Sequence, residues 1–205
     1  MKIRHALAQA YWRVSRWSPD PTPPPPGGGG ILIGAPHTSN WDFVIMLALA
    51  WHWDINVRWL GKDSLFKRPF GPIMRTLGGI PVHRENPAGL VDHIVDRVRQ
   101  NGPTYLVITP EGSRSPVPYW KSGFYRIARE AGMPVTLGYV DRTTMTAGLG
   151  PTLELTGDVR ADMDLVRAFY ADKAGFDPSR RTEPRLREED RPAPDAATGE
   201  AGSTA

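Results

Sequence analysis

Cysteine is absent from this 205-residue chain, and long apolar runs are absent as well. Without thiols the protein has no disulfide bond, no thiolate zinc site and no cysteine nucleophile, which fits a reducing compartment. The longest apolar run, Phe43 to Trp51, has nine residues, whereas a membrane-spanning helix needs roughly 18 to 20. The first 17 residues contain four basic side chains and no long apolar stretch, so they do not resemble a signal peptide.

Positive and negative charges are unevenly distributed along the chain, whose net charge is +3. Residues 1–153 contain 17 Lys and Arg against 10 Asp and Glu, a net charge of +7; residues 154–205 contain 8 against 12, a net charge of −4. The basic part favours anionic substrates or an anionic membrane surface as partners. No nucleic-acid partner is expected, because the chain has no zinc-finger spacing, no RNA-recognition signature and no block of consecutive basic residues.

Composition divides the chain into four parts. Residues 1–18 predict an amphipathic helix whose basic residues and two tryptophans suit either a membrane interface or packing on the domain. Residues 19–30 are rich in Pro and Gly and predict a linker. Residues 31–177 hold the core, and residues 178–205, rich in Arg, Glu, Pro, Ala and Asp, predict a disordered tail.

Within residues 31–177, apolar segments of strand length alternate with segments of helical periodicity. This alternation predicts a single α/β domain, with a mostly parallel sheet flanked by helices on both faces. In such a sheet the active loops lie at the carboxyl ends of the strands. The expected strands are 31–35, 55–60, 79–83, 104–109 and 134–140; the expected helices are 40–53, two short ones within 65–77, 87–100, 122–131 and 162–174.

His37 and Asp42 follow the first expected strand and are the leading candidates for catalysis. A carboxylate beside an imidazole fixes its tautomer and stabilises the imidazolium, as a general base for a hydroxyl requires. Five residues along a helix amount to about 140° of rotation, so the side chains converge only if His37 precedes a helix and Asp42 lies in its first turn. The alternative is a polar loop histidine followed by a helix-starting aspartate.

A second candidate site follows the fourth expected strand, in the sequence Pro-Glu-Gly-Ser-Arg-Ser. This block combines a guanidinium fork, hydroxyls and a glycine that lets the backbone approach a ligand, and such a combination suits a phosphate. Arg84, at the end of the third expected strand, is a second cation for the same anion. The alternatives are an ordinary surface turn and an exposed arginine. The candidate residues of the block are Glu111, Gly112, Ser113 and Arg114.

The order of these blocks is similar to that in the glycerolipid acyltransferases of the lysophosphatidate acyltransferase type. The resemblance covers residues 31–140, about half of the chain. It rests on His-x4-Asp, Gly-x4-Arg, Pro-Glu-Gly-Ser-Arg-Ser and Met133-Pro134-Val135. The chain departs from the family pattern at Pro36, where members usually carry Asn, and at Pro81-Val82-His83, before the arginine.

The resemblance implies transfer of an acyl chain from acyl-CoA or acyl-carrier protein to a hydroxyl of a lysophospholipid-type acceptor such as 1-acylglycerol-3-phosphate, in phospholipid biosynthesis. By this resemblance, His37 is the base and Asp42 its partner. Arg84 and Arg114 hold the phosphate of the acceptor, in a loop shaped by its glutamate and glycine. The acyl thioester is a co-substrate and no cofactor is implied. The protein is expected to be cytoplasmic and peripheral on the inner membrane face.

Other functions have weaker support. Ser113 is a poor hydrolytic nucleophile, because the Gly-x-Ser-x-Gly elbow is absent and no histidine follows it, His93 being the last. No pair of histidines has the spacing of a metal site on one helix, so no metal is expected. A non-catalytic membrane-surface lipid-binding protein on the same fold is the alternative from another class.

Overall fold

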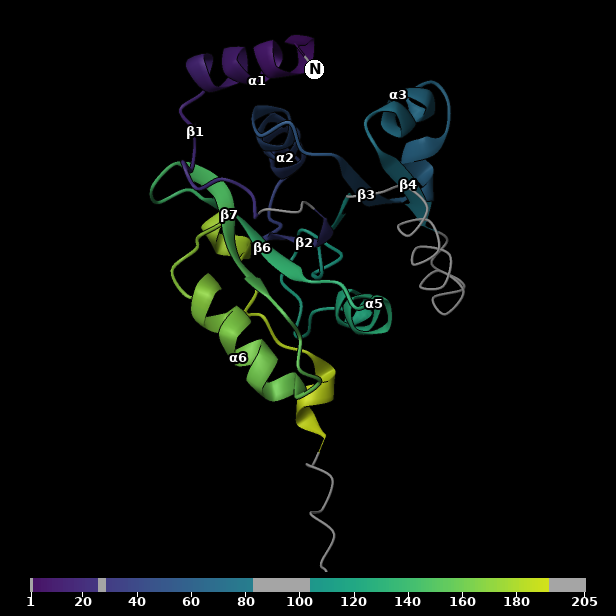
Figure 1. Ribbon diagram of the computed structural model, residues 1–205, viewed down its shortest axis with the longest axis vertical. Coiled ribbons are helices and arrows are strands. Elements are labelled where there is room, and N and C mark those ends of the chain that lie inside the picture. Colours follow the sequence, from purple (N-terminus) through teal and green to yellow (C-terminus); the bar gives the residue numbers. More distant parts are fainter. Residues whose placement is uncertain (1, 26–28, 83–103, 192–205) are drawn as a thin grey trace, which may run out of the picture.

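A sheet of seven strands forms the centre of the part of the chain that the computed structural model describes, which is residues 2–25, 29–82 and 104–191 (Figure 1). The strands are β1 Ser18–Pro19, β2 Gly30–Ala35, β3 Val57–Lys62, β4 Gly79–Val82, β5 Tyr105–Ile108, β6 Val135–Asp141 and β7 Thr146–Leu153. The α-helices are α1 Lys2–Val14, α2 Trp41–His52, α3 Gly71–Thr76, α5 Gly123–Ala131 and α6 Val159–Tyr170; short 3-10 helices are η1 Asp63–Phe66, η2 Pro178–Arg180 and η3 Arg187–Asp190.

The strand order is β1-β7-β6-β2-β5-β3-β4. Neighbouring strands are parallel except for β6 and β7, which pair antiparallel. The predicted mostly parallel α/β sheet is therefore confirmed. Strand β7 was not predicted, because Gly148, Gly150 and Pro151 are poor strand formers. The short connection after Asp141 returns the chain as an antiparallel neighbour of β6.

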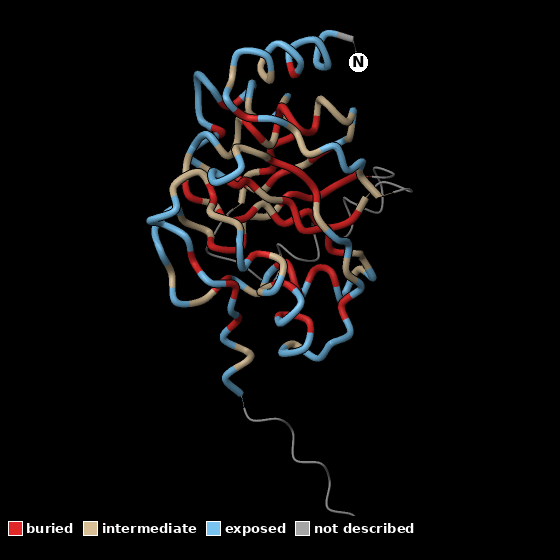
Figure 2. The backbone as a smooth tube through the Cα atoms, turned by 90° about the vertical axis from the view of Figure 1, so that its left-hand side faces the viewer, coloured by how far each residue is buried: buried red, intermediate tan, exposed pale blue. Residues whose placement is uncertain are grey.

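Helices cover both faces of the sheet, as the sequence predicts. Alternate side chains of a strand point to opposite faces. Ile31 and Ile33 of β2 are fully buried in the cluster that contains α5 and α6 side chains, whereas Leu32 belongs to the cluster that contains α2 side chains. Figure 2 shows the buried backbone concentrated in the centre between these layers. The apolar run of α2 is thus a core helix, and no described helix is long and apolar enough to cross a membrane.

Helix α1 forms where predicted, and it packs on α2 (Figure 1). Only part of its apolar surface is buried. Ala8 is buried and Trp12 packs against the core, while the large side chains Leu7 and Val14 are exposed. The predicted role of the tryptophans at a membrane interface is wrong for Trp17, which is buried and stacks on Phe176 at 5.5 Å between ring centroids.

The expected linker 19–30 is also partly built into the fold. Ser18 and Pro19 pair with β7, and the carboxylate of Asp20 accepts a hydrogen bond of 2.6 Å from the hydroxyl of Tyr139. A Pro-rich composition predicts an extended segment, but it does not reveal that an extended segment can serve as an edge strand.

The predicted disorder from residue 178 is wrong for residues 178–191. Leu186 is fully buried, and Arg167 of α6 holds Glu189 by an ion pair of 2.6 Å. A charged composition predicts disorder when the charges have no partners, and here a few residues find partners on α6. Residues 192–205 and the expected helix 87–100 lie outside the described residues.

Candidate active site

Two loops meet at the carboxyl ends of β2 and β5, which are neighbours in the sheet. Residues 36–42 follow β2, and residues 110–115 follow β5. Parallel neighbours end at the same edge, so residues more than 70 apart in sequence come into contact there. The backbone N–H of His37 donates a hydrogen bond of 2.9 Å to Oε1 of Glu111. The two sequence blocks therefore form one site.

The side chains of His37 and Asp42 lie in contact, with Nδ1 of the imidazole 3.1 Å from Oδ2 of the carboxylate. His37 precedes α2 and Asp42 lies in its first turn, which is the arrangement that their spacing requires. Oδ2 also accepts the backbone N–H groups of Thr38 and Ser39, at 2.8 Å each. These bonds and the positive end of the helix dipole stabilise the carboxylate.

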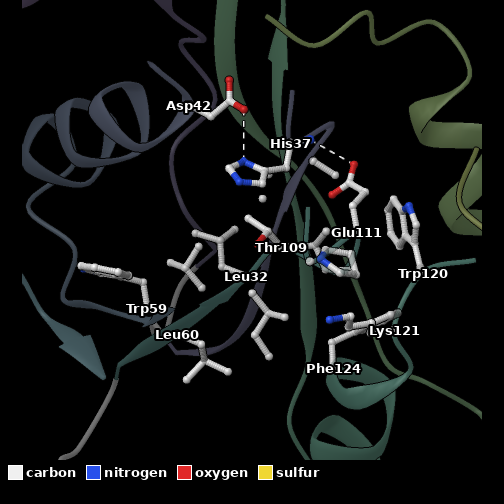
Figure 3. A pocket seen from close by; sticks show the side chains of 18 of the residues that line it. Leu32, His37, Asp42, Trp59, Leu60, Thr109, Glu111, Trp120, Lys121 and Phe124 are labelled. Carbon is white, nitrogen blue, oxygen red and sulfur yellow. Dashed lines mark hydrogen bonds and ion pairs between the residues drawn. The ribbon is translucent and has the colours of Figure 1, made fainter. Parts of the chain in front are cut away.

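The contact with Asp42 determines which nitrogen of His37 is free. A carboxylate only accepts hydrogen bonds, so in the neutral imidazole Nδ1 carries the proton and Nε2 keeps its lone pair. Figure 3 shows the ring with its far edge turned away from Asp42, toward apolar side chains of a cavity that include Leu32. The imidazole is therefore oriented to take a proton from a group bound in that cavity.

Glu111 is a buried carboxyl beside this pair, with 3% of its surface exposed. Burial raises its pKa to about 7, although the hydrogen bond from the backbone N–H of His37 lowers it. Among the described residues, no hydrogen-bond partner contacts its second oxygen, Oε2. Glu111 therefore holds the His37 loop through one oxygen and changes charge near neutral pH.

The remainder of the 110–115 loop lies close to Lys121. Gly112 adopts a left-handed backbone with φ +63°. A side chain there would meet Lys121, since an added Cβ would lie 2.8 Å from Nζ. Ser113 bonds within the loop, its hydroxyl donating to the carbonyl of Ser115 at 3.1 Å. Glycine at this position thus permits both the turn and the approach of an ammonium group.

Arg114 lies at the rim, where its guanidinium donates a hydrogen bond to the side-chain oxygen of Asn40. Asn40 lines the cavity, whereas Arg114 and Ser113 do not. Arg114 is exposed, and its predicted partner Arg84 lies outside the described residues. Of the two arginines in the predicted anion site, the structure therefore describes only Arg114.

The cavity next to His37 has a volume of 1110 Å³, above the range of roughly 300–1,000 Å³ usual for small-molecule pockets. Its wall is largely apolar, with cations among the lining residues. The apolar lining includes Leu32, Phe43, Met46, Leu49, Trp59, Leu60, Ile108 and Phe124; the cations are Lys62, Lys121, Arg126 and Arg187. This volume and lining suit a long acyl chain attached to an anionic group.

Sequence reasoning missed Lys121, Arg126 and Arg187 as cavity residues. Lys121 follows the Pro-Glu-Gly-Ser-Arg-Ser block closely, so proximity in sequence was an available signal. Arg187 lies in the segment expected to be disordered, and nothing in the sequence places it in the cavity wall. Within the described ranges, no group of three His, Asp or Glu could hold a metal ion.

Comparison with known proteins identifies the family of the chain. The family model named Acyltransferase matches residues 18–137, more than half of the chain. The chain belongs to the Acyltransferase family. Membership in the Acyltransferase family implies an acyl donor and a lipid acceptor as substrates. Comparison with curated proteins finds no match.

A solved structure shows the same fold. It is the crystal structure of the 1-acyl-sn-glycerophosphate acyltransferase PlsC from Thermotoga maritima, with a TM-score of 0.57 and 18% sequence identity over 80% of this chain and 75% of that chain. At this identity the likeness shows the fold alone. The pairing of His37 with Asp42 is read from the present structure alone.

Proposed function

We propose that the protein transfers an acyl chain from an acyl thioester to a hydroxyl of a lysophospholipid-type acceptor such as 1-acylglycerol-3-phosphate. The observation that carries this proposal is the His37–Asp42 pair, whose free imidazole nitrogen faces a large apolar cavity. Membership in the Acyltransferase family supports the reaction class. The likeness in fold to PlsC, a 1-acyl-sn-glycerophosphate acyltransferase, supports the choice of acceptor.

In the proposed mechanism the acceptor hydroxyl lies against Nε2 of His37, which takes its proton as the oxygen attacks the thioester carbonyl. Asp42 stabilises the imidazolium that forms. The tetrahedral intermediate then collapses, the C–S bond breaks, and the imidazolium returns its proton to the leaving thiolate. The acyl chain passes directly between the substrates, so no acyl-enzyme is required. No cofactor enters this sequence.

Three cations, at two places in the site, suit the two anionic substrates. Arg114, beside Asn40 at the rim, is suited to the phosphate of the acceptor, because a guanidinium forms paired hydrogen bonds to phosphate. Lys121 and Arg187 line the cavity and suit the phosphates carried by acyl-CoA or by the prosthetic arm of acyl-carrier protein.

A lipid acceptor is reached from a membrane surface, and we place the contact at the end of the molecule that carries α1 and α3 (Figure 1). Exposed apolar side chains and exposed cations occur together there. The apolar ones are Ile3, Leu7 and Val14 near α1 and Leu65, Phe70 and Ile73 near α3; the cations include Arg4, Arg13, Lys67 and Arg68. This surface suits peripheral binding to an anionic membrane, such as the inner membrane face.

The test is an acyl-transfer assay with labelled acyl-CoA or acyl-carrier protein and a panel of lysophospholipids. We expect product with the wild type and a loss of roughly 100- to 10,000-fold in kcat for His37→Ala. His5→Ala, an exposed histidine of α1, is the matched control and should keep wild-type activity. Undiminished activity of His37→Ala would refute the base. Binding of acyl-CoA without product for any acceptor would favour a non-catalytic lipid-binding protein on the same fold.

A further inference from the structure

The segment 175–191, which we call the C-terminal strap, contacts the His37 loop and the chain that follows the Glu111 loop. Its first contact is with the His37 loop. The backbone N–H of Asp177 donates a hydrogen bond of 2.9 Å to the hydroxyl of Thr38. Thr38 is 1% exposed and lies between His37 and Asp42 in the sequence. Gly175 packs so closely that an added Cβ would lie 3.0 Å from Thr38 Cγ2 and 3.1 Å from Pro36 Cβ.

The strap also holds the chain that follows the Glu111 loop. Its carbonyl at Arg185 accepts the backbone N–H of Trp120 at 2.7 Å, and Leu186 bridges to the same residue. The hydroxyl of Tyr119 donates to Asp190 at 2.6 Å. Arg187 then joins the cavity wall. One segment therefore contacts both the His37 loop and the chain that follows the Glu111 loop.

Helix α6 anchors the strap at its far end. Arg167 forms an ion pair of 2.6 Å with Glu189, and Arg160 donates to the backbone carbonyl of the same residue at 2.9 Å. Arg181 donates to the carbonyl of Tyr170 at 2.8 Å. The strap is thus a fixed support, and it lies entirely outside the segment 18–137 that the family model matches.

We infer that the strap is a positioning element of the active site. It acts through the hydrogen bond from Asp177 to Thr38 and keeps the side chains of His37 and Asp42 in contact. Thr38 uses its backbone N–H to bind Asp42 and its hydroxyl to bind the strap. A shift of the strap therefore moves the carboxylate that orients the imidazole. This inference rests on the proposed acyl transfer for its kinetic readout alone.

The first test removes the acceptor of that hydrogen bond. Thr38→Val keeps the shape of the side chain and should lower kcat about tenfold with KM nearly unchanged, in line with one lost hydrogen bond. Thr38→Ser keeps the hydroxyl and should retain most of the activity. Thr136→Val is the matched control, since Thr136 is also 1% exposed and bonds to Thr152 of β7. Equal losses in Thr38→Val and Thr38→Ser would overturn the inference.

The second test changes a residue of the strap instead of Thr38. Gly175→Ala places a methyl group against Thr38, while Gly132→Ala, at a similar backbone angle (φ +61° against +70°), meets no atom within 4 Å. Both changes carry the same backbone strain, so we expect a fall in kcat for Gly175→Ala alone. Combined with Thr38→Val, the loss should be less than the product of the separate losses.

A third readout needs no substrate. The imidazole nitrogen shifts of His37 in NMR spectra report which nitrogen carries the proton. We expect one tautomer, with the proton on Nδ1, in the wild type and both control variants, and a mixture in Thr38→Val and Gly175→Ala. An inactive wild type would refute the proposed function but leave this measurement decisive. A single tautomer in all variants would overturn the inference.

Discussion

The two loops of the site differ in how firmly they are held. The loop 36–42 is tied by Asp42 to its own backbone, by Glu111 to the neighbouring loop, and by Thr38 to the strap. The loop 110–115 is buried at Glu111, but its outer part is exposed and Arg114 reaches a single side chain, Asn40. The loop 36–42 is thus held by three sets of contacts, whereas the loop 110–115 is held mainly at Glu111.

This difference suits the two chemical tasks that we propose for the loops. A general base must hold its nitrogen within hydrogen-bond reach of the reacting hydroxyl, and small displacements reduce the rate strongly. A guanidinium that binds a phosphate acts over a broader range of positions and can adjust as the ligand arrives. Changes in the loop 36–42 should therefore lower kcat, and changes at Arg114 should raise the KM for the acceptor.

The largest effect is expected for Asp42→Asn. The amide oxygen can take the place of Oδ2 and keep its hydrogen bonds, but the neutral amide lacks the negative charge that stabilises the imidazolium formed during proton transfer. We expect kcat to fall roughly 100- to 10,000-fold. Asp158→Asn is the control, because Asp158 accepts two backbone N–H groups at the start of α6 without facing a histidine. A comparable loss in both variants would break the assignment.

The next effect concerns stability at the contact between the loops. The pKa of Glu111 is about 7 in the folded protein against an ordinary value of 4.5. From pH 4.5 to 7 the unfolded chain releases this proton while the folded protein keeps it, so the contribution to stability is present below pH 4.5 and lost by pH 7. A glutamine in place of Glu111 does not titrate, so this pH-dependent contribution would be absent.

Relative to the wild type, Glu111→Gln should therefore gain about 3 kcal/mol in free energy of unfolding between pH 5 and pH 8. Urea denaturation at several pH values measures this difference. Glu130→Gln, at a half-exposed glutamate of α5, provides the baseline. A difference that does not grow with pH would show that the carboxyl is ionised throughout.

A smaller effect is expected at the rim. Arg114→Ala should raise the KM for the acceptor about 10- to 150-fold, which corresponds to a lost charged hydrogen bond of roughly 1.5–3 kcal/mol. The KM for the acyl donor should remain nearly unchanged, and Arg114→Lys should restore part of the loss. Steady-state kinetics with each substrate varied separately will decide. An equal rise in donor KM would assign Arg114 to the phosphates of the donor.

The smallest effect lies on the surface that we place at the membrane. Leu7→Asp should weaken binding to anionic vesicles about tenfold, because a buried leucine contributes roughly 1.5–3 kcal/mol. Leu165→Asp changes a leucine of similar exposure on α6, 57% against 53%, and should not affect binding. Sedimentation should also show binding that falls as salt rises. Equal behaviour of the two variants would place the contact elsewhere.

Much of this organisation follows from the sequence. The alternation of apolar segments predicts the parallel sheet, and the position of His37 after one strand and Glu111 after another predicts that both lie at one edge. The His37–Asp42 spacing allows their contact when His37 precedes a helix and Asp42 lies in its first turn, and the structure has that arrangement. These features depend on patterns and spacings among residues that are close in the sequence, so one sequence is enough to reveal them.

The sequence does not determine which long-range contacts complete the site. Strand β7 forms although its glycines and proline disfavour a strand, because β6 offers it an edge. The charged strap packs because α6 supplies partners for a few of its residues, and Leu186 fills a buried position. Composition describes a whole segment, whereas the packing of that segment depends on a few individual residues and on the partners they find. The sequence by itself therefore determined the candidate pair His37–Asp42 and the sheet that presents it, and only the tertiary structure decided what holds that pair in place.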